Sequence, residues 1–265
     1  MSDTSSTPSP FEAAYPFVLW IFLGVGFVSF VSLFFIQAPY GKHSEGSGKG
    51  WGPKFSGKFG FMIQETPAVF LPPIYYYLSD RRQAQLILLI IWEIHYIQRT
   101  FISTILQPTN NKNTSFSIMI FALIFQFANT YLVFFGICFR DKELFDINMF
   151  KDPFVILGFI IFFCAYVGNI ISDTILRRLR KPGDTNYYIP HGFLFEFISA
   201  PNYFCEMLEW FGYMIGTKFH VGTIAFFVWT IYSLFPRALG HHQWYKKKFG
   251  SEYPSNRKAI IPFIL

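Results

Sequence analysis

The chain has 265 residues, of which 52% are hydrophobic and 22% aromatic, whereas only 14% are charged. A soluble domain usually carries about a quarter charged residues, so this composition excludes an ordinary soluble globular protein. The net charge of +6 and the mean hydropathy of +0.33 fit apolar segments joined by basic loops. The cysteines, Cys138, Cys164 and Cys205, are isolated, which excludes a disulfide framework and a zinc-binding spacing.

Residues 1–14 are polar and predict a short disordered tail ahead of a single domain over residues 15–265. Seven windows of that domain approach the ~20 apolar residues that cross ~30 Å of hydrocarbon. They cover residues 15–36, 61–78, 85–106, 116–139, 153–176, 192–215 and 221–239. Because lipid offers backbone groups no hydrogen-bond partner, the windows predict an all-α integral membrane protein with seven transmembrane helices. The sixth window contains several glutamates and is expected to be broken or partly interfacial.

Lysine and arginine indicate the orientation, since cytoplasmic loops carry an excess of both. With seven spans, most of these residues fall in the loops 37–60, 107–115 and 177–191 and in the C-terminal segment. This pattern places the N-terminus outside the cell or in a lumen and the C-terminus in the cytoplasm. An even number of spans would blur the asymmetry.

Polar residues inside a span are costly and therefore mark candidate functional sites. The first group is Gln64 and Glu65 in FMIQETPAVF, which point about 100° apart on a helix. An apolar surrounding favours a neutral Glu65 that can donate a hydrogen bond. Pro67 interrupts local backbone bonding and can open space for a ligand. The alternative is a pair that only fixes helix packing.

The second group lies in EIHYIQRTF, where His95 and Arg99 share one helical face and Tyr96 lies on the adjoining one. A buried tyrosine hydroxyl beside a buried acid is suited to donate a proton to a carbonyl oxygen. His95 and Tyr96 are equally typical of aromatic residues at a membrane interface, and the sequence leaves both interpretations open.

The third group is a polar stripe in which Asn169, Asp173, Arg177 and Arg180 fall within an ~80° sector of one helix. It rises from the membrane interior to guanidinium groups, which can bind phosphate bidentately. Basic residues at a cytoplasmic helix end are also ordinary topology determinants and lipid contacts. Since this does not explain Asn169 and Asp173, we favour a phosphate-bearing cofactor.

The fourth group, Arg237, His241, Tyr245 and Lys248, repeats at helical spacing near the C-terminus. It fits either a basic amphipathic helix on the membrane surface or the completion of a nucleotide site by charge and stacking. The glycine-containing segments match neither a Rossmann fingerprint nor a Walker A motif, so a nucleotide would have to bind among helices.

In this order, the groups resemble the steroid 5α-reductase family of integral-membrane oxidoreductases. The resemblance covers residues 40–265 and rests on the motifs YGKH (40–43), QE (64–65), HYIQRTF (95–101), NIISDTILRRLRKPG (169–183), Y.IP.G (187–192), Asn202, EWFGY (209–213), RALGHHQWY (237–245) and RKAIIPF (257–263). The Gln-Glu and His-Tyr pairs make it closer to the steroid-reducing members than to the related enoyl-CoA reductases.

The resemblance implies a seven-helix bundle that binds NADPH from the cytoplasmic side and reduces the Δ4 double bond of a 3-oxo-Δ4 steroid. It assigns Glu65 and Tyr96 as catalytic residues at the C3 ketone, and Gln64 and Arg99 complete the expected substrate site. With the polar stripe it assigns the cofactor to residues on several segments, namely Tyr40, Asn169, Asp173, Arg177, Arg180, Tyr187, Asn202, Arg237, His241 and Tyr245.

Besides the steroid and membrane lipid we expect no metal, no nucleic acid and no second subunit. The expected location is the cell inner membrane for a bacterial source and the endoplasmic reticulum membrane for a eukaryotic one. Three other functions stay open: another lipid-enone or enoyl-CoA reductase, a membrane methyltransferase, and a non-catalytic channel or lipid-binding protein.

Overall fold

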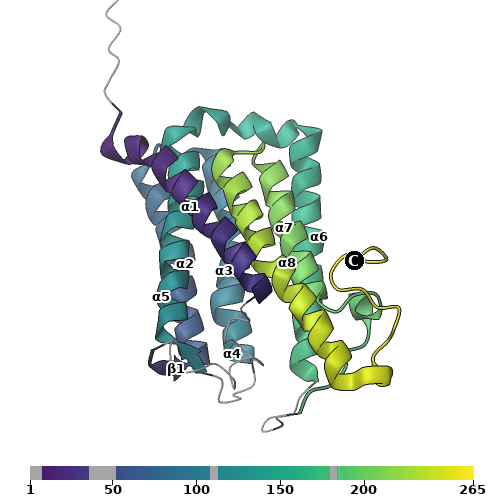
Figure 1. Cartoon of the computed structure of the whole chain (residues 1–265). Helices are drawn as coiled ribbons and strands as arrows, with labels where there is room; N and C mark the ends of the chain where they lie inside the picture. The colour runs from purple at the N-terminus through teal and green to yellow at the C-terminus, as the bar shows by residue number, and fades with distance from the viewer. Residues whose placement is uncertain (1–7, 36–51, 108–112, 180–183, 185) are drawn as a thin grey trace, which may run out of the picture.

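A computed structural model describes residues 8–35, 52–107, 113–179, 184 and 186–265. Tyr40 and Arg180, two of the expected cofactor ligands, lie outside this part of the chain. Within it the long helices run side by side as a bundle (Figure 1). Two short strands, β1 (Lys54–Ser56) and β2 (Asn113–Ser115), pair antiparallel at one end of the bundle.

The bundle consists of long helical segments, some of which change their helix type part-way. These segments are α1 (Pro10–Phe35), α2 (Gly57–Leu78), α3 (Gln83–Ile97) with the π-helix η2 (Gln98–Ser103) and α4 (Thr104–Leu106), α5 (Phe116–Thr130) with the π-helix η3 (Tyr131–Arg140), α6 (Pro153–Arg178), α7 (Pro201–Gly216) and α8 (Val221–Phe249). The short 3-10 turns are η4 (Lys142–Leu144), η5 (Ile147–Lys151), η6 (Phe193–Glu196) and η7 (Gly250–Glu252).

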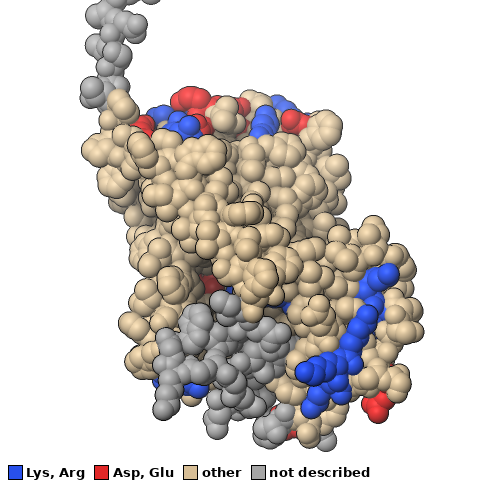
Figure 2. Space-filling view, in the orientation of Figure 1, with Lys and Arg blue, Asp and Glu red and all other residues tan. Residues whose placement is uncertain are grey.

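Five of these segments are long and apolar enough to cross a membrane: α1, α3 through α4, α5 through η3, α6, and the segment that starts with α8. α2 and α7 fall short of that criterion but lie alongside the others (Figure 1). Figure 2 shows a broad, nearly uncharged belt between charged groups at the top and a basic stripe at the lower right. The fold is consistent with the all-α integral membrane protein that the sequence predicts. Seven spans and their orientation stay predictions.

The first helix begins at Pro10, earlier than the predicted window, because a capping box starts it. The backbone N–H of Ser9 donates to Glu12 Oε2 (2.8 Å), and the backbone N–H of Glu12 donates to Ser9 Oγ (3.3 Å). Pro10 occupies the first helical position, where its missing N–H costs nothing. The helix therefore takes in the last residues of the predicted tail, and residues 1–7 lie outside the described part.

The sixth and seventh windows also differ from their predicted bounds. Residues 192–200 contain only the 3-10 turn η6, Ile198 forms a parallel bridge to Lys258, and α7 starts only at Pro201. The C-terminal segment also holds that stretch, since the backbone N–H of Ser199 donates to the carbonyl oxygen of Lys258 at 2.9 Å. α8 continues to Phe249, beyond the predicted end at residue 239. Its last turns are stabilised by Tyr245, which is buried and stacks on Tyr253 with ring centroids 5.4 Å apart.

The main core packs α2, α3, η3, α6, α7 and α8 around Trp92, which has no exposed surface. The Trp92 indole N–H donates to the carbonyl oxygen of Ala68 at 2.8 Å. That carbonyl lacks its usual helical donor because the residue four positions on is Pro72, which has no N–H. Trp92 thus satisfies a carbonyl group that a proline leaves free, and it fixes α2 against α3.

α6 and α7 touch through glycines. A Cβ atom at Gly158 would lie 2.5 Å from the backbone nitrogen of Gly216, and one at Gly212 would lie 2.5 Å from that of Phe162. Small residues let helices approach this closely within lipid. The contact fixes the polar stripe of α6 against the polar residues of α7.

Candidate active site

Glu65 is held inside the bundle by two glutamine side chains. Its Oε2 accepts a hydrogen bond from Gln126 Nε2 at 2.5 Å, and its Oε1 accepts one from Gln64 Nε2 at 3.3 Å. Gln126 belongs to α5, which packs along α2. Neighbouring helices therefore set the direction in which the carboxyl group points.

Tyr96 lies beside this carboxyl group. Only 3% of its surface is exposed, and its ring stacks on Trp92 with centroids 4.6 Å apart. Tyr96 interacts electrostatically with Glu65 and with the amide of Gln126. Its position is inside the core and not at the surface of the bundle.

Arg99 connects the expected substrate residues with the expected cofactor residues. Its Nη1 donates to Asp173 Oδ2 at 3.3 Å, and its Nη2 lies 3.7 Å from Glu206 Oε2. The guanidinium lies over the ring of Phe61 at 5.5 Å and interacts electrostatically with Glu65. The single positive charge of Arg99 therefore interacts with carboxyl groups from α2, α6 and α7.

Three of the expected cofactor residues form one hydrogen-bonded group where α6 meets α7. Asn169 Nδ2 donates to the backbone oxygen of Asn202 at 2.9 Å, and Asn202 Nδ2 donates to Asp173 Oδ1 at 3.1 Å. Through Asp173 this group also contacts Arg99. The electrostatic attraction of Arg99 to Glu65 and the hydrogen bonds of Asp173 thus connect Glu65 on α2 with Asn169 on α6.

A histidine–glutamate pair lies on the same side of α3 as Arg99. His95 Nδ1 is 2.6 Å from Glu209 Oε1, and both side chains are almost fully buried. The His95 ring also packs on Trp210, with centroids 4.6 Å apart. The second oxygen, Glu209 Oε2, has no hydrogen-bond partner among the described residues.

The remaining described cofactor residues lie in the last turn of α6, in the segment before α7 and in the C-terminal half of α8. The ring of Tyr187 packs on Trp244 at 4.8 Å, and that of His241 on Tyr203 at 5.3 Å. Arg237 is exposed, and Arg177 donates through Nη2 to its neighbour Thr174 at 2.8 Å. Tyr203 directly follows Asn202 on α7, so His241 lies close to the Asn169 group.

Several contact residues were not singled out from the sequence. Gln126, Glu206 and Glu209 hold Glu65, Arg99 and His95 respectively. A polar side chain in an apolar window is the signal that each offers. That signal does not identify the partner, which depends on how α5 and α7 pack against α2 and α3.

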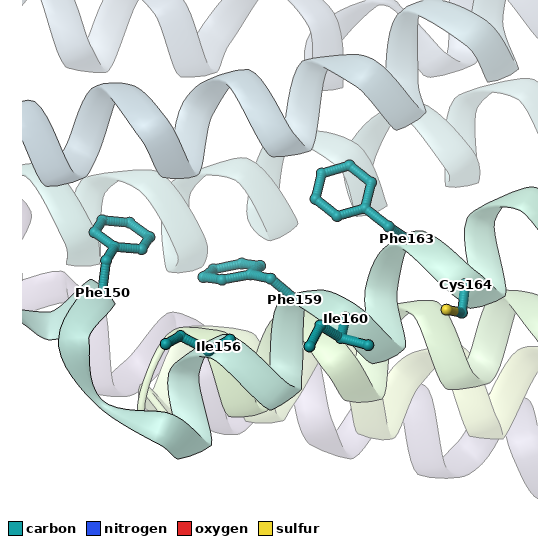
Figure 3. A pocket seen from close by; sticks show the side chains of 6 residues that line it. All are labelled: Phe150, Ile156, Phe159, Ile160, Phe163 and Cys164. Carbon is teal, nitrogen blue, oxygen red and sulfur yellow. The ribbon is translucent and has the colours of Figure 1, made fainter.

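An apolar groove on the outer side of α6 does not belong to the site. Figure 3 shows its lining, which consists of Phe150, Ile156, Phe159, Ile160, Phe163 and Cys164. It offers no acid or base for chemistry on a ketone. Among the described residues, no three His, Cys, Asp or Glu side chains are grouped to hold a metal ion.

Comparison with known proteins identifies the family. Residues 112–265 match the family described as 3-oxo-5-alpha-steroid 4-dehydrogenase. The chain is 36% identical to steroid 5-alpha-reductase DET2 of Arabidopsis thaliana over 88% of this chain and 90% of that relative. The chain belongs to the steroid 5α-reductase family.

Animal members of the steroid 5α-reductase family match to a similar extent. The chain is 36% identical to 3-oxo-5-alpha-steroid 4-dehydrogenase 1 of Rattus norvegicus, over 91% of this chain and 92% of that relative. For the Homo sapiens protein of the same name the identity is 37%, over 85% of each chain. The resemblance read from the motifs is therefore confirmed. Family membership makes the chain an oxidoreductase acting on CH–CH groups and implies a nicotinamide cofactor.

Proposed function

We propose that the chain reduces the Δ4 double bond of 3-oxo-Δ4 steroids such as testosterone or progesterone, with NADPH as reductant, to 5α-steroids. The observation that carries the proposal is the series of electrostatic and hydrogen-bonding interactions from Glu65 through Arg99, Asp173 and Asn202 to Asn169, in a member of this family. A substrate bound at one end of this path and a cofactor at the other would be close neighbours.

Glu65 and Tyr96 are the proposed groups that bind the C3 ketone. An enone accepts hydride poorly until its oxygen is polarised, and two hydrogen bonds to that oxygen stabilise the negative charge that develops there. A preorganised donor in a dry site can contribute about 3–4 kcal/mol to the transition state. Glu65 serves as a donor in its neutral form, which the surrounding apolar helices favour. Gln64 and Arg99 complete the substrate side of the proposed site.

The residues present fit a dinucleotide. Asn169, Asp173 and Asn202 offer amide and carboxyl groups for its polar parts. Arg257 is 1% exposed and bonds through Nη1 to Pro190, while its Nε and Nη2 have no partner within the described part of the chain, as suits an anionic group.

On this proposal, the other cofactor contacts come from residues on several segments, namely Tyr40, Arg177, Arg180, Tyr187, Arg237, His241 and Tyr245. When bound, NADPH supplies a hydride to C5 of the steroid. The role of the protein is then to hold the ketone, exclude water and orient the two reactants.

The proposal includes the membrane arrangement. Seven spans with the N-terminus outside or in a lumen place the basic stripe of Figure 2 and the C-terminal half of α8 at the cytoplasmic face. NADPH then enters from the cytoplasm, and an apolar steroid reaches the site from the lipid. The protein acts as a monomer in this scheme.

The test is NADPH consumption by the detergent-purified protein given testosterone or progesterone, with the product identified by mass spectrometry. We expect Glu65→Gln and Tyr96→Phe each to lower kcat by about 10²-fold or more, since the phenylalanine removes one hydrogen bond to the oxyanion and the glutamine replaces an acidic O–H donor with a weaker amide N–H donor. Glu93→Gln and Tyr75→Phe are matched controls on α3 and α2 and should retain wild-type turnover.

Wild-type turnover in folded Glu65→Gln and Tyr96→Phe would remove the catalytic assignment. Reduction of an enoyl-CoA or another lipid enone, with no reduction of either steroid, would move the function to a related reductase. Binding of S-adenosylmethionine instead of NADPH would favour a methyltransferase. A protein that neither binds nor oxidises NADPH with any enone would be a lipid-binding member.

A further inference from the structure

The hydroxyl group of Ser199 joins segments that lie far apart in the sequence. Ser199 precedes α7 and is 3% exposed. Its Oγ lies 2.6 Å from His242 Nδ1 on α8, 2.6 Å from the hydroxyl oxygen of Tyr253 and 3.0 Å from the carbonyl oxygen of Lys258. That carbonyl oxygen also accepts the backbone N–H of Ser199 at 2.9 Å. We call Ser199, His242, Tyr253 and Lys258 the Ser199 clip.

The donors and acceptors in the Ser199 clip follow from the chemistry of a hydroxyl group, which offers one O–H donor and two acceptor lone pairs. A carbonyl oxygen only accepts, so Ser199 donates to Lys258. The Tyr253 hydroxyl and His242 Nδ1 then both donate to Ser199. A serine beside a histidine can act as a nucleophile. Here the hydroxyl is buried and its hydrogen-bonding capacity is filled, which indicates a positioning role instead.

The Ser199 clip holds residues to which the proposed function assigns the cofactor. The ring of Tyr253 stacks on that of Tyr245 with centroids 5.4 Å apart, and the guanidinium of Arg257 lies over the Tyr253 ring at 5.2 Å. Arg257 is the buried arginine whose Nε and Nη2 have no partner within the described residues. The other cofactor residues close to the clip in the chain are His241 and Asn202. These residues belong to separate segments, so a tie between the segments sets their spacing.

We propose that Ser199 is a positioning residue that assembles the cofactor site before NADPH binds. Without its hydroxyl group, α8, the start of α7 and the C-terminal segment are held less tightly, and NADPH has to order them at the expense of affinity. Ser199 itself does not touch the cofactor in this scheme. The inference rests on the proposed function, because it gives the Ser199 clip a role only through NADPH.

The first test is Ser199→Ala, which removes the hydroxyl and keeps the backbone N–H that donates to Lys258. We expect the Kd for NADPH, measured without steroid by the quenching of tryptophan fluorescence, to rise about 10-fold. In turnover with saturating steroid, the KM for NADPH should rise by a similar factor. The kcat should stay within about threefold, because the reaction starts from the assembled site. An unchanged Kd would overturn the inference.

Variants of the two donors test the hydrogen bonds themselves, also if Ser199→Ala fails to fold. Tyr253→Phe keeps the ring that stacks on Tyr245 and removes one donor, so the Kd for NADPH should rise about threefold or more. His242→Asn retains an N–H donor near the position of Nδ1 and should stay within about threefold of the wild type. His242→Leu should match Ser199→Ala. Equal Kd values for the asparagine and leucine variants would contradict the donor role of His242 and with it the inference.

Hydrogen exchange provides a readout that needs no cofactor. Without NADPH, amides in peptides that cover residues 192–200 and 254–265 should exchange about 10-fold faster in Ser199→Ala than in the wild type, since both segments open more often. Unchanged exchange in both peptides would show that the hydroxyl does not tie them together.

Thr217 provides the matched control. It is a buried hydroxyl residue at the other end of α7, and its Oγ1 lies 2.8 Å from Thr223 Oγ1. Thr217→Val should lower the Tm and leave the Kd for NADPH within about twofold, because it removes a buried hydrogen bond outside the cofactor site.

The outcomes separate this inference from the proposed function. If the wild type binds NADPH and Ser199→Ala binds it equally well, this inference alone is overturned, even where the Tm of the variant falls. If the wild type binds no NADPH, the proposed function and this inference are overturned together.

Discussion

At the scale of single residues, Arg99 interacts with more carboxyl groups than any other residue of the candidate site. Its guanidinium contacts Asp173 and Glu206, whose side chains are 20% and 15% exposed, and it also interacts with Glu65. Arginine suits this place because its planar fork presents several N–H donors to different acceptors at once. Removing it would leave carboxyl groups crowded together without a counter-charge.

We therefore expect Arg99→Met to lower the free energy of unfolding by about 2–4 kcal/mol, as when one partner of a mostly buried ion pair is removed. The measurement is thermal unfolding in detergent. Adding Asp173→Asn and Glu206→Gln should restore most of the Tm by removing the uncompensated charges. The triple variant should remain inactive, because the connection to Glu65 is still absent. A Tm that the single change leaves unaltered contradicts this account.

At the scale of helices, α3 and α7 present matching polar positions. His95 and Arg99 lie one turn apart on α3 and η2, and they meet Glu209 and Glu206, one turn apart on α7. The π-helix η2 begins between the two pairs at Gln98, and π-helical turns of this kind are frequent at functional sites. The spacing of His95 and Arg99 on one face is the part that the sequence predicts correctly.

The glycine contact between α6 and α7 is the second feature at this scale. Gly212→Ala places a methyl group 2.5 Å from the Phe162 nitrogen, so it should separate the helices and destabilise the protein by about 1–3 kcal/mol. Gly24→Ala is the matched control, since no atom lies within 4 Å of its added Cβ. The control should be neutral or slightly stabilising in a helix. Equal Tm values for both variants would contradict the packing argument.

The observed helix bounds show which boundaries the sequence patterns predict and which they do not. The apolar windows located the helices α2 and α6 well, and α6 is also long and apolar enough to cross a membrane. The order Ser9, Pro10 and Glu12 is a signal for a helix start at Pro10. The polar composition of residues 1–14 instead predicted a disordered tail there. The late start of α7 depends on the bridge between Ile198 and Lys258, which joins distant segments.

The sequence predicts only part of the candidate site, because contacts between distant segments depend on tertiary packing. The resemblance of the motifs assigns Glu65 and Tyr96 to the substrate and Asn169 and Asp173 to the cofactor. The contacts between them run through Gln126 and Glu206, whose roles depend on tertiary packing of α5 and α7. A periodic pattern within one helix carries no information about the face of the neighbouring helix.

At the scale of the whole molecule, charges lie at the two ends of an apolar bundle (Figure 2). The proposed orientation makes η5 external or lumenal and η7 cytoplasmic. We expect a membrane-impermeant maleimide to label Asn148→Cys only from the outer face and Ser251→Cys only from the cytoplasmic face, with Cys164→Ala in the background. Both positions are exposed, so access depends on the side of the membrane. Labelling of both positions from one side would contradict the proposed seven-span topology.

The aromatic packing around the site has an optical consequence. Trp92 and Trp210 are 0% and 2% exposed, their ring centroids lie 5.2 Å apart, and both rings pack against Tyr96. These two indoles are therefore a built-in fluorescent reporter for whatever occupies the space beside the tyrosine. A coloured ligand that reaches Tyr96 will quench their emission, whereas one confined to the lipid-facing groove of α6 will not.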